Sequence, residues 1–174
     1  MLLAAPHRGL FVIGMTQGLL LMAWWVFDLA GRHGGLGLLW SPALPSVWLH
    51  ALMLTHGVFA SFIFGFILTA GPRWQQRPDT PPAVYRPVVR LFAAGWLLAD
   101  LGLFLPVLLA PGLLLAAAGW SIALWFLWQL ALTGPRDRRH ILAMALAQTA
   151  GVLSLLTFAL LAAGGAVWLG PAAI

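Results

Sequence analysis

The stretch WLHALMLTHGVFASFIFGFILTAGPRW, residues 48–74, decides the fold. It has enough consecutive apolar residues to cross a membrane as one helix, which takes about 20. It also carries two histidines, His50 and His56. Polar groups are costly at that depth, so ionisable residues inside a span mark candidate functional sites.

The whole chain has the composition of an integral membrane protein. Of its 174 residues, 62% are hydrophobic and 7% are charged, whereas a soluble domain is about 45–50% apolar and about 25% charged. Cysteine is absent, which excludes disulfides and thiolate metal sites. The nine positive charges are arginines scattered among apolar runs, so they form no basic face for nucleic acid.

Apolar runs of spanning length predict an all-α bundle of about five transmembrane helices within a single domain, residues 1–174. The expected spans are Leu10–Leu29, Val47–Ala70, Val88–Leu109, Gly112–Thr133 and Ile141–Trp168. The proline-rich segment Pro72–Pro87 is expected to be a loop, and Ala110–Gly112 a tight turn. Pro106 is expected to kink the third helix or to end it early.

The distribution of arginine predicts the orientation, because positive charges gather in cytoplasmic loops. Only Arg32 falls on the opposite side of an alternating five-span path from the other arginines: Arg8, Arg73, Arg77, Arg86, Arg90, Arg136, Arg138 and Arg139. This places the N-terminus inside and the C-terminus outside. Four tryptophans are expected to anchor helix ends at the membrane surfaces: Trp40, Trp48, Trp74 and Trp168.

Four ionisable residues lie within or beside the expected spans: Asp28, His50, His56 and Asp100. His50 and Asp28 both lie near the outer surface and can form a pair there. His56 is six residues deeper, or about 9 Å, which is similar to the depth of Asp100, so these two can form a second pair. The structural alternatives are that His50 reaches the membrane surface, Asp28 ends its helix, and His56 bonds a neighbouring helix. The glutamines Gln17, Gln129 and Gln148 are expected to bridge helices.

Small residues four apart form a stripe on the second span, a pattern that lets membrane helices approach closely. The stripe consists of Gly57, Ser61, Gly65 and Thr69. His50 points to the same side as this stripe, and His56 points about 120° away, toward a different neighbour.

Met53 lies between the two histidines, so His50, Met53 and His56 are candidate metal ligands. Imidazole is an axial ligand of haem, and imidazole with thioether suits copper. Asp28 and Asp100 are the groups available to orient the two imidazoles. The structural alternative for Met53 is plain packing.

The end of the second span, Gly65–Trp74, is similar to the Gly-Phe-Leu-Leu-Thr-Ala-x-Pro-x-Trp motif of the NnrS family. His50 falls where that family has the first histidine of its motif, and Gly57 also matches. The segment His7–Phe11 resembles the family's Arg-Pro-Phe-Phe entry to its first helix. Leu52 and Met53 stand where the family has a second histidine and a glutamate, which makes His56 a candidate substitute.

The resemblance implies a bacterial inner-membrane protein that contains haem and copper and protects against nitric oxide, in connection with denitrification. It implies that the chain corresponds to the N-terminal half of longer relatives, with His50 as the favoured ligand. Such a chain is a binding or redox protein rather than an enzyme, and it is expected to pair with a second copy or with another membrane subunit. Two other functions stay open: a transporter or channel subunit using His56 and Asp100, and an assembly subunit that docks through the small-residue stripe.

Overall fold

The computed structural model describes residues 2–34, 42–134 and 138–164, and these residues form helices and short connections without a strand. A short 3₁₀ turn, η1, precedes the first long helix. In chain order the elements are η1 (Leu2–Ala4), α1 (Pro6–His33), α2 (Ser46–Leu52), η2 (Met53–Phe59), α3 (Ala60–Trp74), α4 (Pro82–Gly102), η3 (Pro106–Leu108), α5 (Leu109–Thr133) and α6 (Arg139–Gly164).

Five helical passes form the bundle, because α2, η2 and α3 join into one continuous rod, Ser46–Trp74. This rod, α1, α6 and the segment Pro106–Thr133 are each long and apolar enough to cross a membrane. The remaining pass, α4, is the third along the chain; it carries Arg86, Arg90 and Asp100 and is less apolar. The expected all-α bundle is therefore confirmed, and the chain is a multi-pass membrane protein.

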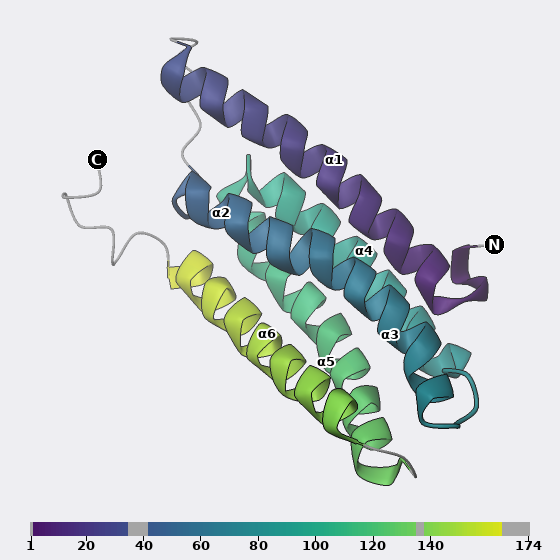
Figure 1. Cartoon of the computed structure of the whole chain (residues 1–174). Helices are drawn as coiled ribbons and strands as arrows, with labels where there is room; N and C mark the ends of the chain where they lie inside the picture. Colours follow the sequence, from purple (N-terminus) through teal and green to yellow (C-terminus); the bar gives the residue numbers. More distant parts are fainter. Residues whose placement is uncertain (1, 35–41, 135–137, 165–174) are drawn as a thin grey trace.

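The passes are arranged with α1 and α6 along opposite sides of the bundle and the other three between them (Figure 1). The outer position of α1 and α6 agrees with their burial, since each buries a smaller share of its residues than the central rod or α5. The odd number of passes places the start of α1 and the end of α6 at opposite ends of the bundle (Figure 1). Which end faces the cytoplasm stays a prediction.

Glycine lets the two central helices α4 and α5 touch through their backbones. A Cβ on Gly95 would lie 2.5 Å from the backbone nitrogen of Ala116, and a Cβ on Gly112 would lie 2.5 Å from that of Ala99. Neither distance leaves room for a side chain. This contact makes α4 and α5 the most extensively packed pair of helices in the bundle.

Proline positions account for the boundaries that sequence reasoning misplaced. The turn between the third and fourth passes lies at residues 103–105, followed by η3. The third pass ends early, at Gly102, as expected, and Pro106 starts the 3₁₀ turn. The tight turn expected at Ala110–Gly112 is wrong, because these residues lie in α5, where the missing N–H of Pro111 in the first turn costs little. Pro72 and Pro87 lie inside α3 and α4, so the loop between these helices is shorter than predicted.

Two of the four tryptophans predicted to anchor helix ends lie within the described residues. Trp48 and Trp74 are exposed at the two ends of the central rod, as membrane anchors should be. Trp40, Trp168 and Arg136 lie outside the described residues, as does the predicted end of the last span beyond Gly164.

Candidate functional site

The first histidine, His50, lies on α2 and packs against an aromatic ring of α1. The centroids of the His50 and Trp25 rings are 4.3 Å apart, with 33° between their planes. The guanidinium of Arg32 lies 5.3 Å from the centroid of the same Trp25 ring. The Nδ1 atom of His50 is buried and has no hydrogen-bond partner among the described residues. His50 therefore faces α1, and among the described residues it contacts that helix through the Trp25 ring.

Asp28 does not pair with His50, because both of its carboxylate oxygens have other partners. The Ser46 hydroxyl donates a hydrogen bond of 2.7 Å to Asp28 Oδ1, and Arg32 forms an ion pair with Oδ2. Asp28 is buried and joins the last turns of α1 to the first residue of α2. The expected Asp28–His50 contact is not formed, since Arg32 lies one helical turn from Asp28 and competes for the carboxylate.

The second histidine, His56, lies within η2, a π-helical segment that the sequence did not indicate. Single π-turns inside α-helices occur frequently at functional sites. His56 Nδ1 lies 2.7 Å from Thr55 Oγ1 and 3.2 Å from the carbonyl oxygen of Leu52. A carbonyl oxygen only accepts, so the hydrogen bond to Leu52 requires the tautomer with the proton on Nδ1, in which Nε2 carries the lone pair. The His56 ring faces Trp120 of α5, with centroids 5.5 Å apart.

The two histidines therefore face different helices, His50 toward α1 and His56 toward α5. Met53 is fully buried in the hydrophobic core, which is the plain packing role that sequence reasoning left open. Among the described residues, no group of three or more histidine, aspartate or glutamate side chains is arranged to hold a metal ion. His50, Met53 and His56 as ligands therefore stay a prediction, with the two histidine rings directed at different helices.

Asp100 bonds to α1 rather than to His56. Gln17, which is buried, donates a hydrogen bond of 2.8 Å from Nε2 to Asp100 Oδ1. The amide passes beside Gly57, where an added Cβ would lie 2.9 Å from Gln17 Cγ. The expected His56–Asp100 contact is not formed, whereas the helix-bridging role predicted for the glutamines is confirmed for Gln17.

The small-residue stripe of the central rod packs against α1. Its members face Gln17, Gly14 and Phe11 in turn, and a Cβ on Gly65 would lie 2.6 Å from Phe11 Cε1. At the end of the stripe, Thr69 Oγ1 lies 3.2 Å from His7 Nδ1. The stripe permits the predicted close packing, but it does so inside the chain and is not free to receive a partner.

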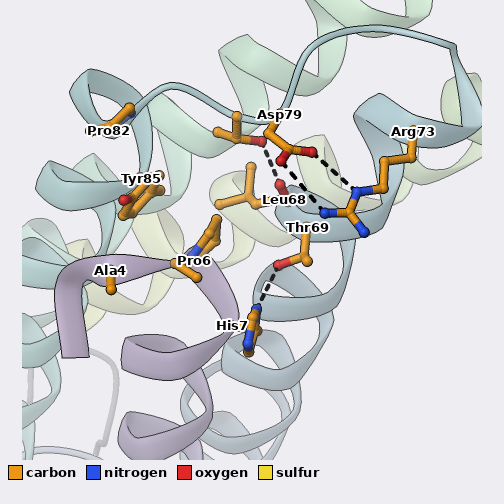
Figure 2. Close-up of a pocket in the computed structure, with 11 residues that line it drawn as sticks. Ala4, Pro6, His7, Leu68, Thr69, Arg73, Asp79, Pro82 and Tyr85 are labelled. Carbon is orange, nitrogen blue, oxygen red and sulfur yellow. Dashed lines mark hydrogen bonds and ion pairs between the residues drawn. The ribbon is translucent and has the colours of Figure 1, made fainter. Parts of the chain in front are cut away.

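The end of α3 adjoins a small polar cavity of about 180 Å³ (Figure 2). Pro72 has no N–H to bond the carbonyl of Leu68 four residues earlier, and the Thr80 hydroxyl donates to that carbonyl instead. Arg73 Nε donates to Asp79 Oδ1 at 3.1 Å, which ties α3 to the following loop. The polar groups around this cavity thus mainly hold the end of α3 to the loop that follows it.

A comparison with protein-family models shows which family the chain belongs to. The family model described as NnrS protein matches residues 1–173. The chain belongs to the NnrS family. No curated protein and no solved structure matches it.

In this NnrS-family chain, two of the segments that carried the resemblance, His7–Phe11 and Gly65–Trp74, lie against each other. His7 and Phe11 of α1 contact Thr69 and Gly65 of α3, respectively. The motif that ends near Trp74 thus packs α3 against the first turns of α1. The polar residues His7 and Thr69 of these segments contact each other and neither His50 nor His56.

The histidines fit a metal-containing group only in part. His56 has the arrangement typical of a ligand, with Nδ1 held by a backbone carbonyl and Nε2 left to coordinate. His50 lacks such a second hydrogen bond. A single-imidazole site at His56 therefore suits the structure, and a shared site with His50 and His56 on one metal does not.

Proposed function

We propose that this chain is a bacterial inner-membrane protein that holds haem, with copper as the second metal to be tested, and that it protects cells from nitric oxide. The support is the membership of the NnrS family together with the environment of His56. A bound haem iron or copper ion would supply the centre that takes up nitric oxide. The role proposed here is binding, and no catalytic step is assigned to the chain.

One observation supports His56 over His50 as the ligand: the hydrogen bond between His56 Nδ1 and the Leu52 carbonyl. It orients the ring and favours the tautomer in which Nε2 is the nitrogen that would bind metal. The π-helical turn sets His56 against the ring of Trp120, with the two ring centroids 5.5 Å apart. His50 is the second choice, since its buried Nδ1 has no group to orient it.

The test is the haem and metal content of the full chain, purified from cells supplied with haem precursor and copper. We expect a Soret band or stoichiometric copper in the wild type, a large loss in His56→Ala, and little change in His50→Ala. His140→Ala is the matched control, because His140 is exposed at the start of α6. Added imidazole should restore part of the absorption of His56→Ala by replacing the missing ligand.

Two results would overturn the proposal. One is a well-folded wild type that binds neither haem nor copper, and the other is a His56→Ala variant that retains the full content of both. If His50→Ala alone removes the bound group, the ligand is His50 and the assignment made here is wrong. The role against nitric oxide is tested separately, by the growth of cells expressing wild type or His56→Ala in the presence of a nitric oxide donor.

A further inference from the structure

A cavity of about 360 Å³ lies between α1 and α4, away from both histidines. Its walls come from apolar side chains, among them Leu20, Ala23 and Phe27 of α1 and Phe104 after α4. Leu20, Phe27 and Phe104 are exposed to the surroundings of the bundle, which in a membrane are lipid. Cavities that bind small molecules measure roughly 300–1,000 Å³, so this one is at the small end of that range.

One ionisable group lines this cavity, the carboxyl of Asp100. Oδ1 accepts the hydrogen bond from Gln17, and Oδ2 receives none from the described residues. None of these residues forms an ion pair with Asp100 either. A carboxyl group offers about four acceptor positions, so one amide leaves most of its hydrogen-bonding capacity unused in an apolar setting.

Apolar walls together with one partly unsatisfied carboxyl favour a ligand that has an apolar body and a polar head. An apolar body matches the walls, and a hydrogen-bond donor matches the free side of Asp100. In an otherwise apolar pocket, a small number of well-placed polar groups usually orients the bound molecule. A ligand of this kind dissolves in the bilayer and can enter between α1 and α4 directly from the lipid.

We propose that the cavity between α1 and α4 binds a membrane-soluble alcohol or amine, with its head on Asp100 and its chain along Leu20, Ala23 and Phe27. The site is independent of the haem proposal, because neither His50 nor His56 lines it. Gln17 positions the carboxyl from α1, so both walls of the cavity take part in presenting Asp100 to the ligand.

The test uses three photoreactive dodecyl probes that differ only in the head group: an amine, an alcohol and a plain hydrocarbon. Each is added to the full chain in phosphatidylcholine nanodiscs, and the labelled residues are mapped by mass spectrometry. We expect the amine, the alcohol or both to label residues 20–27 and 100–104 several-fold more than the hydrocarbon does. Labelling by the amine alone would indicate a charged head, and labelling by both a neutral donor.

Two variants separate the site from general lipid contact. Asp100→Leu removes the acceptor, and Ala23→Phe fills the cavity while leaving Asp100 and Gln17 in place. Both should reduce the enrichment to the hydrocarbon level. Leu19→Phe is the matched control, since Leu19 is exposed on the same helix outside the cavity. If Asp100→Leu does not fold, Ala23→Phe decides. Equal labelling by all three probes, or enrichment that survives in Ala23→Phe, would overturn the proposal.

Discussion

Adding one methyl group to Gly95 should force α4 and α5 apart. The new carbon would lie 2.5 Å from the backbone nitrogen of Ala116 and 2.9 Å from the carbonyl oxygen of Gly112. Ordinary contacts of a Cβ start at 3.4 Å, so the first distance is short by about 0.9 Å. Both obstacles are backbone atoms, and no change of side-chain rotamer can relieve the clash.

The size of the effect follows from the helices involved. Overpacking a core costs about 1–3 kcal/mol, and we expect the upper end because the whole α4–α5 contact has to separate. For a chain of this size, about 3 kcal/mol corresponds to a fall of roughly 6–12 °C in the melting temperature. The shift of α4 should also disturb the bond between Asp100 and Gln17, since Asp100 lies on the same helix.

The assay is the loss of monodisperse protein on heating in detergent, followed by size-exclusion chromatography. Gly18→Ala is the matched control, because a Cβ on Gly18 would meet only Val58 methyl groups at 3.8 and 3.9 Å. Alanine also favours the helix by about 1 kcal/mol over glycine, so this control should be unchanged or slightly more stable. A Gly95→Ala variant as stable as Gly18→Ala would refute the backbone contact.

Two further predictions concern the ends of the bundle. Thr80→Val leaves the Leu68 carbonyl without its donor, which should lower the free energy of unfolding by about 1–3 kcal/mol. Thr157→Val is the control and should have no such effect, since the exposed Thr157 hydroxyl bonds to Leu153 of its own helix. Equal melting temperatures of the two variants would contradict this account. A reporter fused after Ile174 should be active in the periplasm and silent in the cytoplasm, because of the arginine distribution; the opposite result would show that the orientation is wrong.

The bundle was predictable because the spans are mainly apolar runs of spanning length bounded by proline, glycine or arginine. The close packing at Gly57 and Gly65, and the divergence of His50 from His56, followed from helix geometry. The partners of the polar side chains did not follow, because they depend on how neighbouring helices are rotated. Gln17 reaches Asp100 only because Gly57 leaves space for its side chain. No sequence pattern announced the π-helical turn that carries His56.

The predicted homodimer, or complex with another membrane subunit, needs a surface other than the small-residue stripe, which α1 covers. Helix α6 lies at the edge of the bundle, and its outer face exposes Leu146, Leu153 and Leu160. These leucines are seven residues apart, the spacing at which two helices pack side by side.

The chain has no cysteine, so a single Leu153→Cys change introduces one thiol and no other. If two copies meet along α6, oxidation in lipid should yield covalent dimers of Leu153→Cys. The control Leu19→Cys, exposed on α1 at the opposite side of the bundle, should stay monomeric. Equal cross-linking of the two variants would indicate random collision, and none in Leu153→Cys would rule out α6 as the contact.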